Sequence, residues 1–314
     1  MISHSEVLVD LAALREQLRG RGSEHLALLR LTPWRPVSDT IVDWVFVLAS
    51  VYAVVVLGPL FIPAAVVIIA NRQRALGNIL HDAGHCNLCR NRQWNDLMAR
   101  ALVAPLLFAS LSGYRDAHYR HHLALGQRAG DPDLLPVPRA WPQHWTTSYL
   151  RNLLCWSTWK GSMAGHLAAP EVGLASHLFI MGWWTLALAA LITLAGNEFT
   201  ITFVLLWLLA RATAFHAITT FREMCDHFGL RPSGILSFTR DVVCHGVWRA
   251  LIHPRNNCYH LTHHLLPAVP YYRLPQAQQL FQQMPAYRDH AIVCQAYFAG
   301  ATAVTRAWQA GSSQ

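Results

Sequence analysis

Two long apolar stretches limit what this chain can fold into. Residues 40–70 are almost wholly apolar, and residues 174–219 form a second apolar stretch that is broken by Gly196-Asn197-Glu198. A helix needs roughly 20 residues to cross the hydrocarbon core of a bilayer, so the first stretch is too long for one comfortable helix and the second is long enough for two crossings. Gly58-Pro59 and Pro63 break the first stretch, because proline ends or kinks a helix. We therefore expect two helical hairpins with four spans, at about residues 41–57, 60–80, 174–195 and 199–219.

Composition and charge agree with a membrane protein. The chain is 53% hydrophobic and only 13% charged, whereas soluble domains are about a quarter charged. A net charge of +8 would suit a nucleic-acid-binding protein, but such proteins do not carry long apolar runs, so we expect no nucleic acid partner. With four spans, every Lys and Arg except Arg211 falls on the side that holds both chain ends. This asymmetry predicts that the shared side is cytoplasmic.

Three histidine clusters lie in the segments assigned to that side. They are His81-Asp82-Ala83-Gly84-His85, His118-Tyr119-Arg120-His121-His122 and His260-Leu261-Thr262-His263-His264. The spacings i, i+4 and i, i+3, i+4 place the imidazoles of each cluster on one face of a helix. Imidazole is the commonest metal ligand in proteins. The clusters therefore predict a cytosolic metal-binding cap in an otherwise all-α membrane protein.

The number of histidines predicts two metal ions. The three clusters hold eight histidines: His81, His85, His118, His121, His122, His260, His263 and His264. Octahedral coordination uses six ligands, so eight are too many for one metal but suit two with open positions. Imidazole favours iron, copper, zinc or nickel, and zinc has no redox chemistry. We expect a di-iron site at the membrane surface, where the inert target would be an alkyl chain.

The apolar run at residues 98–112 is expected not to cross the membrane. Runs this short are more often interfacial, re-entrant or buried, and Arg100 and Pro105 weaken this one further. If it crossed, His85 and His118 would lie on opposite faces of the bilayer and could not share a metal site.

A ninth ligand is expected just after the fourth span, where His216 and His227 are the candidates. We favour His227, with Glu223 or Asp226 orienting it or filling a coordination position. Metal-bound imidazoles commonly donate their second N–H to a carboxylate, and the carboxylates beside the clusters are Asp82, Asp116, Asp131 and Asp133. For Asp131 and Asp133 a solvated loop position remains an equal alternative.

Residues 5–19 predict an amphipathic helix, because leucine and valine recur at helical spacing opposite charged residues. Two placements stay open: on the membrane surface, or packed on the protein's own cytosolic cap. We divide the chain into a cytosolic N-terminal segment, a membrane domain and a cytosolic C-terminal segment, at residues 1–39, 40–285 and 286–314.

The motifs around the clusters resemble one family. The first cluster is followed by Asn91-Arg-Gln-Trp-Asn-Asp96, and the second is preceded by Tyr114-Arg-Asp-Ala and followed by Asp131-Pro-Asp133. The third motif runs from Asn257 to Pro275, with three prolines and two tyrosines after its last histidine. Together these motifs, over roughly residues 40–285, resemble the membrane fatty acid desaturase superfamily of three-His-box di-iron enzymes.

The resemblance implies the cofactors, partners and location. It implies two iron ions (Fe2+/Fe3+) held by the eight box histidines and His227, with dioxygen as co-substrate and no catalytic residue beyond the metal ligands. Glu223, Asp226, Asp82, Asp116 and Asn257 are further candidates for ligation or for orienting the ligands. Electrons would come from a separate ferredoxin, or from a b-type cytochrome with its reductase. The short chain fits a bacterial inner-membrane enzyme with its active site on the cytoplasmic side.

The same ligand set serves several reactions. Our first expectation is a desaturase that introduces a double bond into a lipid-, CoA- or carrier-linked acyl chain. A hydroxylase, a decarboxylase or a natural-product desaturase would use the same di-iron centre. A metal transporter is a more distant alternative, since transport sites lie near the middle of the membrane and the histidine clusters lie outside the predicted spans. A catalytically dead scaffold would require a broken ligand set, and all eight box histidines are present.

Overall fold

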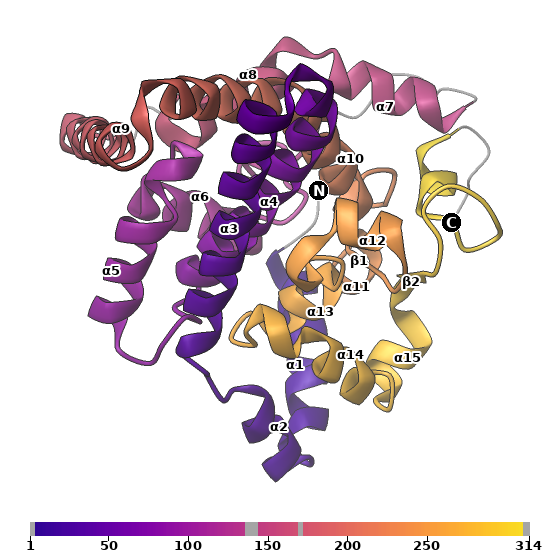
Figure 1. Cartoon of the computed structure of the whole chain (residues 1–314). Coiled ribbons are helices and arrows are strands. Elements are labelled where there is room, and N and C mark those ends of the chain that lie inside the picture. Colours follow the sequence, from indigo (N-terminus) through magenta and orange to yellow (C-terminus); the bar gives the residue numbers. More distant parts are fainter. Residues whose placement is uncertain (1–3, 136–143, 169–171, 310–314) are drawn as a thin grey trace. The chain divides into compact units, whose positions relative to one another are not determined.

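The computed structural model of the chain describes residues 4–135, 144–168 and 172–309. These residues are mostly helical (Figure 1), which confirms the helical fold class. The strands named among them are β1 (Arg240–Val242) and β2 (Ile292–Cys294), which pair in parallel with Asp241 opposite Val293.

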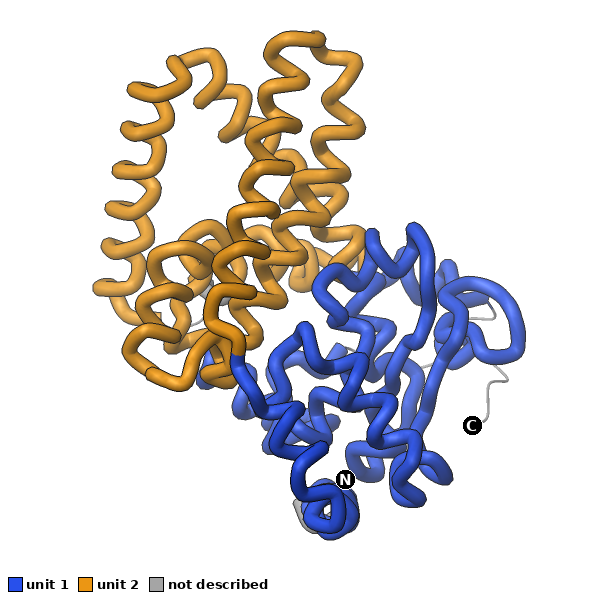
Figure 2. The backbone as a smooth tube through the Cα atoms, turned by 60° about the horizontal axis from the view of Figure 1, so that its bottom comes forward, with its two compact units in different colours: residues 1–31, 115–152, 220–314 blue, residues 32–114, 153–219 orange. Residues whose placement is uncertain are grey.

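The chain divides into two compact units, each assembled from separated stretches (Figure 2). Unit 1 comprises residues 1–31, 115–152 and 220–314, and unit 2 comprises residues 32–114 and 153–219. Both units therefore draw on distant parts of the sequence, whereas our sequence-based segments were consecutive. The boundaries at residues 39 and 285 stay predictions.

Unit 2 contains the apolar helices. Its elements are α3 (Trp34–Leu57), η1 (Pro59–Phe61), α4 (Ile62–Gly84), α5 (Arg92–Leu102), η2 (Pro105–Leu107), α8 (Trp156–Ala164), η3 (Gly165–Ala168), α9 (Leu174–Ala210) and the π-helical η4 (Arg211–Phe215). By length and hydropathy, two helical stretches among the described residues are candidate membrane spans: Trp34–Leu57, and the continuous stretch Leu174–His227. The second is interrupted at Gly196, where φ is 84° and ψ is 172°. This break falls where the sequence predicted the second hairpin turn.

Polar contacts hold the helices of unit 2 together at a few points. Asp43 on α3 is fully buried and forms an ion pair of 2.8 Å with Arg72 on α4. The Gln73 amide of α4 donates to the Trp207 carbonyl of α9 at 2.9 Å. Buried charges are tolerated where they are paired and hydrogen-bonded. These contacts fix the packing of α4, whose C-terminal end carries the first histidine pair.

No single helix covers residues 98–112 in the structure. α5 ends at Leu102, η2 follows at Pro105–Leu107, and α6 (Leu111–Leu123) begins only at Leu111. The left-handed conformation of Phe108, with φ of 53°, turns the chain between them. A broken segment of this kind agrees with the prediction that these residues do not cross the membrane.

Unit 1 is built from short helices around the two strands. Besides most of α6 and of α10 (His216–His227), it contains α1 (His4–Arg19), α2 (Gly22–Leu28), α7 (Trp145–Leu153), α11 (Ile235–Phe238), α12 (Val247–Ile252), η5 (Pro254–Asn256), α13 (His260–Leu265), η6 (Tyr271–Arg273), α14 (Leu274–Phe281), α15 (Pro285–His290) and η7 (Val304–Trp308). Most of the candidate ligands lie on α6, α10 and α13.

The N-terminal helix α1 packs against the rest of unit 1. Leu14 and Leu18 are buried, and Asp10 accepts a hydrogen bond from the Leu236 backbone N–H at 3.1 Å. The Gln17 side-chain oxygen accepts from the Ala286 N–H. Of the two placements left open by the sequence, packing on the protein's own cap is the one that the structure shows.

Candidate metal centre

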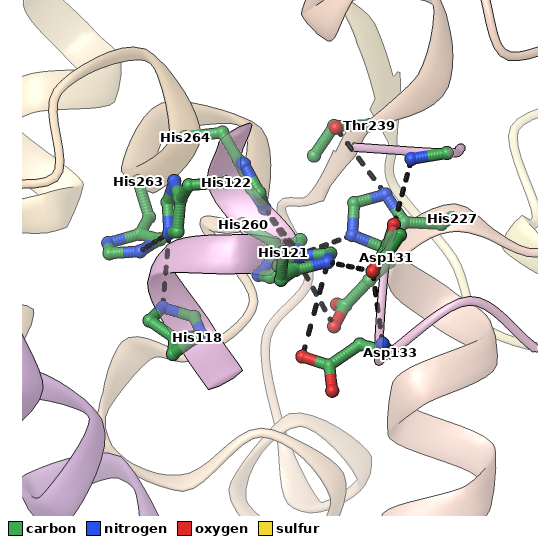
Figure 3. A network of polar contacts seen from close by, with 12 residues as sticks. His118, His121, His122, Asp131, Asp133, His227, Thr239, His260, His263 and His264 are labelled. Carbon is green, nitrogen blue, oxygen red and sulfur yellow. Dashed lines mark hydrogen bonds and ion pairs between the residues drawn. The ribbon is translucent and has the colours of Figure 1, made fainter. Parts of the chain in front are cut away.

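Four histidines of unit 1, of which three are buried and His227 is half-buried, meet at one point. His121 on α6, His227 at the end of α10, and His260 and His264 on α13 each offer one nitrogen, and these four nitrogens all lie within 4.8 Å of one another (Figure 3). We call these residues the His quartet. The Nε2 of His260 lies 2.9 Å from that of His227 and 3.0 Å from that of His264, and the Nε2 of His264 lies 3.2 Å from that of His121. A metal ion bound by these nitrogens would account for their convergence.

Three further histidines form a neighbouring cluster, the His triplet. The Nε2 of His122 lies 3.0 Å from that of His118 and 3.1 Å from that of His263. The rings of His122 and His264 are 4.2 Å apart between centroids, so triplet and quartet adjoin. The i, i+3, i+4 spacing on α6 and on α13 produces this arrangement, since residues at these spacings share a helix face. Each of the two helices contributes to both clusters.

The first histidine pair lies in unit 2. His81 lies in the last turn of α4 and His85 follows the last residue of that helix, with ring centroids 5.2 Å apart. A Cβ at Gly84 would lie 3.3 Å from the Tyr114 ring, so the glycine lets that ring pack closely beside the pair. Asp82 is buried, and its carboxylate lies 3.7 Å from His81 Nδ1. The structure therefore brings His81 and His85 together within their own unit.

Asp131 orients His121. Its Oδ1 lies 2.7 Å from His121 Nδ1, and it also accepts backbone N–H bonds from Gly126 and Asp133. Both side chains are almost fully buried, whereas that of Asp133 is 49% exposed and 4.0 Å from the ring. With Nδ1–H donated to Asp131, Nε2 of His121 is left as the metal-binding atom, as in other carboxylate–histidine–metal arrangements. Of the two alternatives left open for each aspartate, the structure shows a contact with a histidine for Asp131 and a half-exposed loop position for Asp133.

The electrostatics of the quartet suit neutral imidazoles. Burial, followed by the neighbouring histidines, holds the pKa values of His227 and His264 well below the usual range. Burial also acts to lower the pKa of His121, but the hydrogen bond to Asp131 and the negative charges of Asp133, Asp131 and Asp226 together outweigh burial and raise that pKa. Neutral imidazole is the form that binds a metal, so the environment favours the ligand state of His227 and His264.

Of the two candidates for the ninth ligand, only His227 belongs to the quartet. Its Nδ1 donates to the Phe238 carbonyl at 2.8 Å, which points Nε2 at the other ligands. His216 lies in unit 2, where it contacts the Ser162 hydroxyl and the Leu153 carbonyl, each at 2.8 Å.

The other polar candidates, Asp226, Glu223, Asp116 and Asn257, differ in their burial and in their contacts with the quartet. Asp226 Oδ2 lies 3.6 Å from His260 Nε2 and 2.6 Å from Arg222. Glu223 is half-buried and is not part of the quartet, Asp116 is exposed, and Asn257 is buried. Asp226 thus lies beside the quartet at His260, as Asp131 does at His121.

Sequence reasoning missed two groups that hold the ligands in place. One is the Phe238 carbonyl that orients His227, for which a sequence carries no signal. The other is Asp241, a buried carboxylate that binds Thr262 inside the third histidine cluster. Asp241 lies 21 residues from Thr262 in the chain, so no local spacing connects them.

The all-imidazole donor set fits a transition metal such as iron, copper, zinc or nickel. The family model for fatty acid desaturases matches residues 57–296, and the chain therefore belongs to the fatty acid desaturase family. As a member it is a desaturase-type oxidoreductase.

Two curated relatives match different lengths of the chain. The dihydrorhizobitoxine desaturase of Bradyrhizobium elkanii is 28% identical over 267 residues, covering 78% of this chain and 74% of that protein. Fatty acid desaturase 3 of Bos taurus is 31% identical over 84 residues, covering 26% of this chain and 19% of that protein.

Proposed function

We propose that the protein is a membrane-bound di-iron desaturase that uses dioxygen to introduce a double bond into an alkyl chain. The observation that carries the proposal is the His quartet beside the His triplet, with Asp131 fixing the tautomer of His121. Iron at such a site would supply the oxidant for hydrogen abstraction from an unactivated C–H bond. The protein's part is to hold the ligands in place and to keep His227 and His264 unprotonated.

The proposed ligand set follows the clusters. His121, His227, His260 and His264 would hold one iron, with Asp226, whose Oδ2 lies 3.6 Å from His260 Nε2, as a further ligand. His118, His122 and His263 would hold the other, together with His81 and His85, which we include because of the sequence pattern. Glu223 would then serve outside the coordination sphere.

The topology and partners are part of the same proposal. Four spans, with α4 as the second and the break at Gly196 as the second hairpin turn, would leave the histidines on the cytoplasmic side of a bacterial inner membrane. Electrons would come from a separate ferredoxin, or from a b-type cytochrome and its reductase. The positive-inside distribution of charge and the two apolar helical stretches support this arrangement.

We propose an acyl chain, linked to a lipid, CoA or a carrier, as the substrate. One observation favours a second candidate, a specialised small molecule. The relative named for dihydrorhizobitoxine, not for a fatty acid, matches over three quarters of this chain. A hydroxylated product would instead identify the protein as a hydroxylase, and a decarboxylated product would identify it as a decarboxylase, each using the same di-iron centre.

The test is product formation in a host that expresses the protein. Lipids and small metabolites are profiled for the wild type, for His263→Ala and for His290→Ala. His290 is exposed and lies on α15, outside both clusters, so its variant is the matched control. We expect a product two hydrogens lighter than its precursor in the wild type and control only. A product that persists in His263→Ala would refute the proposal.

A further inference from the structure

Strand β1 carries two charged residues that the proposed function leaves without a role. Arg240 is 1% exposed and Asp241 is 0% exposed. Burying a carboxylate is costly unless hydrogen bonds compensate for the lost water. The contacts of these two side chains therefore indicate what they do.

Asp241 accepts three hydrogen bonds from two elements. Its Oδ1 accepts the Thr262 backbone N–H at 3.0 Å, and its Oδ2 accepts the Thr262 hydroxyl at 2.5 Å. Oδ2 also accepts the Tyr287 hydroxyl of α15 at 2.7 Å. Two of the three bonds thus end on one residue, and that residue lies between His260 and His263 on α13.

Helix α13 needs this support because it is only six residues long. Isolated helices of this length do not hold themselves together, and their first N–H groups have no partner within the helix. The N-cap residue Tyr259 supplies no side-chain cap. Asp241 satisfies the Thr262 N–H from outside, so the strand does what a cap residue would otherwise do.

The position of Thr262 on the helix matters for the metal ligands. At 3.6 residues per turn, Thr262 lies roughly opposite the face that carries His260 and His264. Anchoring it by both its N–H and its hydroxyl fixes the rotation of α13 about its axis. That rotation decides whether the two imidazoles meet His121 and His227, and metal sites tolerate deviations of only about 0.2 Å in ligand distance.

The residues just before Asp241 contact the C-terminal end of α10, where the quartet residue His227 lies. The Phe238 carbonyl accepts from His227 Nδ1 at 2.8 Å, and the Thr239 hydroxyl lies 3.4 Å from the same nitrogen (Figure 3). Arg240 donates to the Phe228 carbonyl, directly after His227, and to the Val304 carbonyl at 3.4 Å. Residues 238–241 therefore contact both α10 and α13. We call them the positioning segment.

We propose that Asp241 is a positioning residue, which sets the metal affinity of the His quartet by locking the rotation of α13 through Thr262. Tyr287 on α15 donates to the same carboxylate and so connects the C-terminal part of the chain to the contact between Asp241 and Thr262. The inference rests on the proposed metal site but adds residues that no ligand pattern identifies. Removing partners of metal ligands commonly lowers metal affinity 10- to 100-fold. Because Asp241 acts through the helix backbone, we expect about a tenfold effect for the loss of one bond.

The experiment compares Thr262→Val with Thr262→Ser in the full-length, detergent-purified protein. Cobalt(II) is the probe, and its dissociation constants and visible absorption spectrum are the readouts. Valine keeps the shape of threonine but loses the hydroxyl, whereas serine keeps the hydroxyl. We expect Thr262→Val to weaken one of two cobalt sites about tenfold and to change its spectrum, and Thr262→Ser to restore both.

A matched control separates positioning from general stability. Ser148 is 1% exposed and donates to the Trp308 carbonyl at 2.6 Å, away from the histidines. Ser148→Ala should lower the thermal stability and leave cobalt binding unchanged. Tyr287→Phe removes one hydroxyl and keeps the ring, so it tests the hydrogen bonds of Asp241 even if Thr262→Val fails to fold. This variant should also weaken cobalt binding at the His quartet.

The outcomes distinguish the two proposals. Wild-type affinity and spectrum in both Thr262→Val and Tyr287→Phe would overturn the positioning role and leave the metal site standing. A wild-type protein that binds no cobalt at the histidines would overturn the proposed metal site and the inference with it.

Discussion

Asp131→Asn should weaken metal binding although it replaces one side chain by another of the same shape. The Asp131 carboxylate accepts from His121 Nδ1 at 2.7 Å and from the Asp133 N–H at 3.0 Å on one oxygen, and from the Gly126 N–H at 2.8 Å on the other. An asparagine has one acceptor oxygen, so its NH2 group must face an N–H donor in either orientation. The substitution therefore removes the negative charge and also leaves a buried donor without an acceptor.

The magnitude follows from these contacts. Losing a carboxylate partner of a metal-bound histidine commonly costs about 10- to 100-fold in metal affinity, which corresponds to about 1.4–2.7 kcal/mol. A buried hydrogen bond to a charged group contributes about 1.5–3 kcal/mol, so the two estimates agree. We expect the upper part of this range, because both side chains are almost completely buried.

The assay is iron retention per chain against a graded series of chelator concentrations, with Asp133→Asn as the control from the same loop. The Asp133 side chain is 49% exposed and lies 4.0 Å from His121, so its substitution should change retention less than twofold. Equal retention in the two variants would refute the argument that Asp131 orients His121.

Three further predictions concern the rest of the molecule. The Ser157 hydroxyl lowers the pKa of the Cys155 thiol to about 7, so Cys155 should be the first of the seven cysteines to react with iodoacetamide at pH 7. Its reaction should become slower as the pH falls below 7, and Ser157→Ala should slow it as well. Peptide mass spectrometry gives the rates. Gly229→Ala should destabilise the protein by about 2–4 kcal/mol, because Gly229 has φ of 80° and a Cβ there would lie 2.0 Å from the Ala307 carbonyl oxygen. The control is Gly22→Ala, which has open space at its Cβ and should leave the melting temperature unchanged. Removing the metal with a chelator should lower the melting temperature of the wild type, because a ligand that binds only the folded state stabilises that state. An unchanged melting temperature after chelation would argue against a metal that bridges α6, α10 and α13.

The histidine clusters could be predicted from sequence because their spacing is local. The i, i+3, i+4 patterns on residues 118–122 and 260–264 survive in the structure as α6 and α13, and both helices present their histidines to the same clusters. The structure places His227, and not His216, in the quartet, while the role of His227 as a ligand stays a prediction. The break at Gly196 was visible for the same reason, as a local polar interruption.

The supports of the ligands could not be predicted, because they depend on contacts between distant segments. Asp241 reaches Thr262 only once β1 and α13 pack together, and the Phe238 carbonyl that orients His227 is a backbone group. The sequence also left two placements for the N-terminal helix, since an amphipathic face fits a membrane or a protein equally well. The bonds from Leu236 and Ala286 decide between them.

The central claim is that the histidine clusters hold two iron ions in one chain, and metal content tests it most directly. The protein is purified from iron-supplemented cells, and iron per chain is measured together with the Mössbauer spectrum for the wild type and for His264→Ala. We expect about two iron ions per chain in the wild type, with the spectrum of a coupled pair, and loss of at least one in the variant. Zinc in place of iron, or iron content that His264→Ala leaves unchanged, would contradict it.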